Sequence, residues 1–181
     1  MTVHVVHNAV NIQEGHYEQA HTYAQRHAKR IFNPDSRRRQ VRLKPSHKIV
    51  KSVTSALQKH GFMYGRTAGT SVLIHSESGC KRQQWHTDYK PQAISNLRKK
   101  PLGVLVALTD NTLFDTPAQQ FTLKCGDMLV FDGDEVHAGS SYNTENTRFH
   151  MYIDTPTHTR IRNRTYFAKI KNTSNLSHSC L

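Results

Sequence analysis

From residue 62 onward, apolar residues occur in short runs of strand length that are separated by turn-forming residues. The runs are Phe62–Tyr64, Ser71–Ile74, Leu102–Leu108, Phe121–Leu123, Met128–Phe131, Glu135–Ala138 and Arg148–Ile153. Glycine and aspartate mark turns at Gly126-Asp127 and Asp132-Gly133, where their conformational preferences favour chain reversal. Many short strands with turns between them predict an antiparallel sandwich or barrel.

The first 61 residues have a different pattern, with two helical segments. From Glu14 to about Arg30, apolar side chains recur at steps of three and four, which predicts a helix. Pro34 ends it, because proline lacks an amide donor. A second helix is expected with Ser46 as its N-cap and Gly61 as its stop. Its apolar stripe is Ile49, Val50, Val53, Ala56 and Leu57, and a short edge strand precedes both helices at Val3, Val5 and Val6.

The helices precede the strands and do not alternate with them, which argues against a doubly wound parallel sheet. The length of 181 residues suits one domain with a core of its own. The expected fold class is therefore mainly β with N-terminal helices.

Lysine and arginine outnumber aspartate and glutamate by 25 to 13, which gives a net charge of +12. Such an excess attracts nucleic acid, anionic lipid surfaces, acidic proteins or small acids, although a solvated basic surface without a partner explains it equally well. The densest charge run is 36–44. We interpret it as an exposed connector, with a phosphate-contacting patch as the alternative.

The cysteines Cys80, Cys125 and Cys180 are odd in number and form no CxxC pair. This indicates neither a disulfide framework nor a cysteine zinc site. No run of about 18 apolar residues occurs, so no membrane partner is expected. Together these features predict an intracellular, reducing location, cytoplasmic or nuclear.

His86 and Asp88 are candidate metal ligands. In a strand, residues two apart point to the same face, so an imidazole and a carboxylate would lie side by side. Alone, this pattern arises easily by chance. His137, however, follows a turn, a buried strand and a second turn, and antiparallel pairing can bring it close. Two histidines and one carboxylate form a facial triad with open positions, an arrangement that suits non-haem iron(II).

Arg148 lies eleven residues after His137 and opens an apolar strand. A guanidinium near the metal strand is suited to grip a carboxylate with two parallel hydrogen bonds. The alternative is one more surface arginine among many.

These residues resemble the HxD…H…R pattern of the 2-oxoglutarate- and iron(II)-dependent oxygenases. Gln84-Trp85-His86-Thr87-Asp88 and His137-Ala138-Gly139-Ser140, followed by Asn143 and Arg148, look most like the phytanoyl-CoA hydroxylase-like and prolyl-hydroxylase-like branches. The resemblance covers about residues 62–154. It implies a double-stranded β-helix, also called a jelly roll or cupin-like fold, which agrees with the short strands.

The resemblance divides a single oxygenase domain, 1–181, into three parts. Residues 1–61 would be a helical N-terminal support, 62–154 the jelly-roll core and 155–181 a basic C-terminal extension.

The resemblance also implies a chemistry. His86, Asp88 and His137 would bind Fe(II), and Arg148 would bind the distal carboxylate of the cosubstrate 2-oxoglutarate. Succinate and carbon dioxide would be released as an unactivated carbon is hydroxylated, with no catalytic residue beyond the metal ligands. His150 stands where the family has a serine or threonine that helps hold the cosubstrate. The replacement candidates are Tyr64, Ser140 and Asn143.

The substrate is less determined. Collagen-type prolyl hydroxylases have lysine where Arg148 stands, and the second arginine of the nucleic-acid demethylases is missing between Phe149 and Thr159. A protein or peptide side chain is the first expectation, then a small anionic metabolite, then nucleic acid. One alternative function is a catalytically silent basic jelly-roll module that binds nucleic acid or an acidic partner. Another is a cupin that holds zinc, manganese or nickel.

Overall fold

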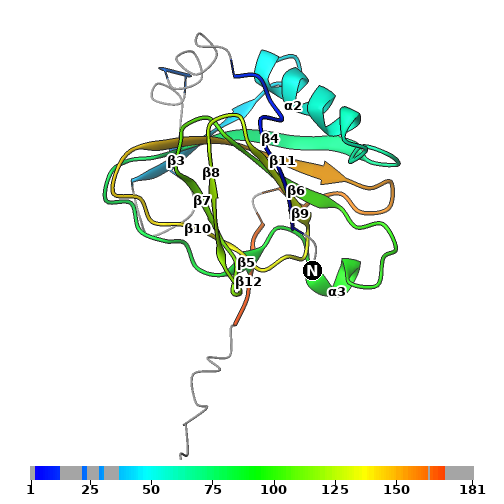
Figure 1. Cartoon of the computed structure of the whole chain (residues 1–181). Helices are drawn as coiled ribbons and strands as arrows, with labels where there is room; N and C mark the ends of the chain where they lie inside the picture. Colours follow the sequence, from blue (N-terminus) through cyan, green and yellow to red (C-terminus); the bar gives the residue numbers. More distant parts are fainter. Residues whose placement is uncertain (1–2, 13–21, 24–28, 31–36, 163, 170–181) are drawn as a thin grey trace, which may run out of the picture.

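The computed structural model describes residues 3–12, 22–23, 29–30, 37–162 and 164–169, and these are mostly β-structure (Figure 1). In chain order the elements are β1 (Val3–Val6), β2 (Lys29–Arg30), β3 (Arg38–Leu43), α2 (Lys48–Lys59), β4 (Thr67–Ser76), β5 (His86–Thr87), α3 (Pro91–Ile94), β6 (Leu102–Ala107), β7 (Thr112–Asp115), β8 (Gln120–Leu123), β9 (Met128–Asp132), β10 (Ala138–Gly139), β11 (Asn146–Asp154) and β12 (Tyr166–Phe167).

The strands form a large sheet and a small sheet that face each other. The large sheet has seven strands in the order β1-β9-β6-β11-β4-β3-β2, and the small one has the order β10-β7-β8. Every pairing is antiparallel. Phe114 of the small sheet meets Phe131 of the large one, with ring centroids 4.8 Å apart. The predicted fold class, mainly β with a jelly-roll arrangement, is confirmed.

Strand β11 lies in the middle of the large sheet and separates its two faces. Phe149, Met151 and Ile153 belong to the core cluster that also contains the buried side of α2. Because strand side chains alternate, Arg148 and His150 point the other way, towards the small sheet. We call the face of the large sheet that lies under α2 the outer face, and the face towards the small sheet the inner face. The predicted stripe of α2, from Ile49 to Leu57, is buried as expected.

The N-terminal predictions are only partly correct. The N-cap of α2 is His47 rather than Ser46, and the His47 side chain accepts the amide of Ile49. Gly61 does end the helix, with a φ of 77°. Most of the predicted helix 14–30 lies outside the described residues. Thr22 and Tyr23 are helical, but residues 29–30 form β2, so the predicted helix end is wrong.

The basic run at 36–44 is not an exposed connector, and this interpretation is wrong. Its residues 38–43 form β3, which pairs with β4. Val41 and Leu43 point into the outer-face core, which fixes the strand's alternation. Arg38 therefore falls on the inner face, where it is completely buried, whereas Arg42 at the far end of the strand is exposed.

Most of the predicted strands after residue 62 are confirmed within a few residues. The segment 62–64 is instead a turn, since it runs into Gly65 with a φ of 63°. The strand expected at 135–138 is shorter and is represented by β10. Strands β7 and β12 were not predicted, because neither shows a clear alternation of apolar and polar residues.

The segment after β11 returns to the body of the protein. Its strand β12 pairs with β5, so that Tyr166 faces Thr87 and Phe167 faces His86 (Figure 1). Cys80 and Cys125 are free thiols, and Cys180 lies outside the described residues. None of the helices in the described part of the chain is long and apolar enough to cross a membrane.

Candidate metal centre

His86, Asp88 and His137 come together at the edge of the inner face. The backbones of His86 and His137 exchange two hydrogen bonds, each 2.9 Å long. On its other side, β5 is paired with β12. The short strand that carries His86 is thus fixed from both sides, and Asp88 follows it directly. This pairing explains how residues 51 positions apart in the sequence become neighbours.

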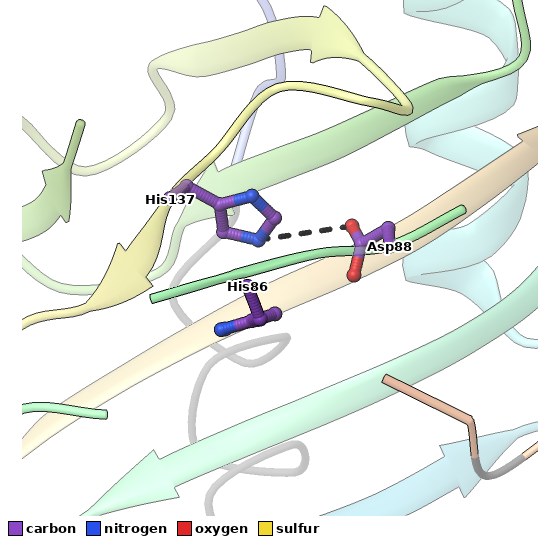
Figure 2. A group of neighbouring side chains, drawn as sticks. All are labelled: His86, Asp88 and His137. Carbon is purple, nitrogen blue, oxygen red and sulfur yellow. Dashed lines mark ion pairs between the residues drawn. The ribbon is translucent and has the colours of Figure 1, made fainter. Parts of the chain in front are cut away.

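The geometry of these three side chains suits one metal ion. One ligand atom from each lies within 4.8 Å of the others, and the structure places no other histidine, cysteine or acidic residue of the described chain in this group. His137 Nε2 is 3.9 Å from Asp88 Oδ2, and the two imidazole rings have centroids 4.4 Å apart (Figure 2). Asp88 and His137 are buried, with 3% and 5% exposure, while His86 is half-buried.

Both imidazoles are oriented by backbone carbonyls. His86 Nδ1 lies 2.8 Å from the carbonyl of Gln84, and His137 Nδ1 lies 2.9 Å from that of Glu135. A proton on Nδ1 satisfies each carbonyl and leaves the Nε2 lone pair free for a metal, which is the usual arrangement around histidine ligands. Asp88 Oδ2 is buried and has no hydrogen-bond partner. An unpaired buried carboxylate oxygen is costly, and a bound cation would compensate that cost.

The charges at this centre follow from burial and proximity. Burial, and next the neighbouring His86, lower the pKa of His137 to about 3, so its ring is neutral at physiological pH. Burial also lowers the pKa of His86. For Asp88, burial acts to raise the pKa, but His137 and His150 outweigh it and hold the pKa below its usual range. The arrangement is therefore two neutral imidazoles and one carboxylate.

Arg148 lies further along the inner face, two residues from His150 on β11. It is buried, and its Nη1 donates to Ser76 Oγ at 3.0 Å and to Asn146 Oδ1 at 3.2 Å. Its guanidinium carbon lies 5.1 Å from the centre of the Tyr142 ring. Among the ion pairs of the described residues, none involves Arg148. The guanidinium can therefore accept an anionic ligand.

Arg38 is a second buried guanidinium beside Arg148, and the sequence reasoning missed it. Both arginines donate to Ser76 Oγ. Burial, and next the positive charge of Arg148, lower the pKa of Arg38 to about 10. Its other acceptors are Cys80 Sγ and the carbonyls of Lys81, Gly139 and Ser140. The alternation of Val41 and Leu43 was the available signal that Arg38 would face inward.

The three other predicted cosubstrate residues have different surroundings. Ser140 is buried, and its hydroxyl donates to Asp115 Oδ1 at 2.6 Å, while its carbonyl accepts from Arg38. Asn143 is exposed. Tyr64 is 82% exposed and lies under the ammonium of Lys99. Of the three, the structure brings only Ser140 to the buried arginines.

His150 also reaches the metal centre, although its place could not be assigned from the sequence. Its Nε2 lies 3.4 Å from Asp88 Oδ2. The wall around His137 is apolar, because Phe114 stacks on its ring at 5.0 Å and Phe131 meets it edge-on at 4.8 Å. A centre with such walls keeps bulk water away from one side.

Comparison with known proteins identifies this architecture. No family model matches the sequence, and no curated protein matches it. Solved structures, in contrast, do match this chain. HygX from Streptomyces hygroscopicus, with nickel and 2-oxoglutarate bound, matches with a TM-score of 0.64 and 11% identity over 88% of this chain and 85% of that one. The fold is that of the 2-oxoglutarate- and iron(II)-dependent oxygenases.

Two prolyl hydroxylases also have this oxygenase fold. A Pseudomonas putida prolyl-4-hydroxylase matches with a TM-score of 0.63 and 10% identity, over 84% of this chain and 92% of that one. The viral collagen prolyl hydroxylase of Paramecium Bursaria Chlorella virus-1, in its 2-oxoglutarate complex, matches with a TM-score of 0.58 and 12% identity, over 86% and 97%. At such identities the likeness establishes the oxygenase fold of this chain.

Proposed function

We propose that this chain is an Fe(II)- and 2-oxoglutarate-dependent dioxygenase that hydroxylates an unactivated carbon and releases succinate and carbon dioxide. The observation that carries the proposal is the buried Asp88 carboxylate, whose Oδ2 lacks a hydrogen-bond partner and faces two neutral imidazoles. His86, Asp88 and His137 would hold the metal. Two histidines and a carboxylate fit iron(II) and leave open positions for further ligands.

The formal charges favour an anionic cosubstrate. Iron(II) with one carboxylate ligand keeps a single positive charge, and Arg148 adds a second in a buried environment. The keto acid end of 2-oxoglutarate matches the metal and its distal carboxylate matches Arg148, since buried guanidinium–carboxylate contacts are strong and directional. When bound, the iron and 2-oxoglutarate supply the oxidising chemistry. The chain's own residues hold the two reactants and exclude water.

The order of inner-face residues on β11 separates a cosubstrate side from a substrate side. Arg148, His150 and Tyr152 follow one another at intervals of about 6.6 Å, twice the rise of a strand residue. His150 lies next to the metal ligand Asp88. If 2-oxoglutarate extends towards Arg148, the substrate enters from the side of Tyr152, where Arg160 covers the Tyr152 ring at 3.9 Å.

A protein or peptide side chain is the substrate class that we favour. Support comes from the inner face at β3. There Arg42 is exposed, Gln40 is half-buried, and Ile74 of β4, which pairs with Gln40, is also half-buried. This part of the sheet is open to solvent and carries the positive charge of Arg42. An extended polypeptide can lie on such a surface, whereas a small metabolite is usually enclosed by its site.

The test is anaerobic binding of Fe(II) with 2-oxoglutarate, followed by succinate release in air. The expected result is that Asp88→Ala abolishes iron-dependent succinate release and that Arg148→Met raises the 2-oxoglutarate concentration required for it. Glu145→Ala, which removes an exposed carboxylate, is the matched control and should leave release unchanged. Unaltered turnover in Asp88→Ala would refute the proposal. Salt-dependent nucleic-acid binding without any decarboxylation would instead favour the silent basic module.

A further inference from the structure

The environment of His150 differs from that of an ordinary core histidine. Its Nε2 lies 3.4 Å from Asp88 Oδ2, and both side chains are buried, with 9% and 4% exposure. Neither atom has a hydrogen-bond partner elsewhere. Two buried polar atoms that lie close together without other hydrogen bonds cost free energy unless they interact. At 3.4 Å the contact is not yet a formed hydrogen bond, and hydrogen bonds that are long in ligand-free sites often tighten on binding.

The ring of His150 is held in place from two sides. Phe131 stacks nearly parallel to it, with centroids 6.2 Å apart and an interplanar angle of 10°. Tyr152 meets it edge-on at 4.5 Å, and the guanidinium of Arg160 covers Tyr152 in turn. Because β11 is also paired on both edges, the imidazole of His150 is held in a fixed position next to the Asp88 carboxylate.

A fixed neighbouring donor can set the orientation in which a carboxylate binds a metal. The terminal torsion of aspartate is broad, so burial alone does not fix which oxygen faces the metal. Within the described residues, the ligand group contains His86, Asp88 and His137 but not His150. His150 contacts this group through Asp88. It therefore lies where a residue that orients a metal ligand would lie.

We propose that His150 is a positioning residue: its Nε2–H donates to Asp88 Oδ2 and fixes the rotation of the carboxylate that binds the metal. The inference rests on the proposed function, because it assumes a metal on the His86, Asp88 and His137 group. It assigns His150 a role in setting metal affinity, apart from the packing of the sheet.

Three substitutions separate donation from packing. His150→Gln keeps an N–H donor at the reach of Nε2, His150→Asn keeps an amide that is too short, and His150→Leu keeps only bulk. The measurement is the affinity of metal-free protein for Co(II) by calorimetry, together with the absorption spectrum of bound Co(II), which reports coordination geometry. Outer-shell substitutions typically weaken metal binding by about 10–100-fold. That loss is expected for Asn and Leu, while Gln stays within about threefold of the wild type.

His75→Leu is the matched control. His75 is also buried, but it pairs with Thr147 and lies on the outer face, so its variant should bind Co(II) like the wild type. Equal affinity in Asn, Leu and Gln variants would overturn the inference while leaving the metal centre intact. If the Leu variant fails to fold, the Asn and Gln pair decides. A wild-type protein that binds no Co(II) would overturn the proposed function itself, and this inference with it.

Discussion

The buried Arg38 gives the sharpest prediction about stability. Its guanidinium is completely shielded from water and has five acceptors. Three of them, the Ser140 carbonyl, Cys80 Sγ and the Lys81 carbonyl, share the two N–H groups of Nη2. The substitution Arg38→Met fills much of the same volume but leaves these acceptors without donors.

The magnitude follows from the balance of these contacts. Because Nη2 has only two N–H groups, it forms at most two full hydrogen bonds, and a hydrogen bond from a charged group stabilises by roughly 1.5–3 kcal/mol. Desolvation of the cation and repulsion from Arg148 offset part of this. Each buried acceptor that loses its donor costs about 1–3 kcal/mol. We therefore expect Arg38→Met to lower the free energy of unfolding by about 3–5 kcal/mol.

The assay is urea unfolding followed by circular dichroism, with Arg39→Met as the matched control. Arg39 is the next residue in β3 and forms an ion pair of 3.0 Å with Glu77, but both side chains are about 40% exposed (43% and 37%). Such a surface pair contributes about 0–1 kcal/mol. If Arg38→Met costs no more than Arg39→Met, the reasoning about the buried network is refuted.

Two further predictions concern the frame around the site. Burial acts to raise the pKa of Asp127, but the amides of Asn8 and Lys124 and the ring of His7 lower it below its ordinary 3.8. Its stabilisation is therefore complete above that value and is lost as the pH falls below it. Urea unfolding between pH 6 and 3 should show a smaller loss for Asp127→Asn than for the wild type, and an equal loss would contradict this assignment. Ala168→Pro removes the amide that donates to Trp85 O at 2.9 Å and should weaken Co(II) binding several-fold by calorimetry, whereas Ala168→Gly should not. Unchanged affinity in the proline variant would show that β12 does not steady β5.

The grouping of His86, Asp88 and His137 and the fold class could be predicted from the sequence for a physical reason. Strand periodicity puts His86 and Asp88 on one face, and the turns around β9 bring His137 back to the same edge. Each of these signals is local. The resemblance to the oxygenases supplied the remaining step, which is that His137 comes close to His86 and Asp88 in the fold.

Other features could not be predicted, because they depend on register between distant strands. Arg38 lies in a run of charged residues, and its burial follows from partners in β4 and β10 that are far away in the sequence. The position of His150 on the inner face follows from that of Arg148, but its contact with Asp88 depends on how β5 lies over the sheet. Strand β12 has too few residues to leave a periodic signal.

The alternation of β11 connects the stability of the core to the geometry of the site. Phe149 and Met151 are completely buried under α2, and they are covalent neighbours of Arg148 and His150 on the opposite face. A core that is close-packed on one side fixes the height and tilt of the strand, and therefore the reach of the two functional side chains. Pairing with β4 and β6 on either edge removes the remaining freedom. We therefore expect a substitution that opens a cavity at Phe149 to disturb the proposed cosubstrate contact of Arg148 and the proposed support of the metal centre by His150, although it touches neither ligand.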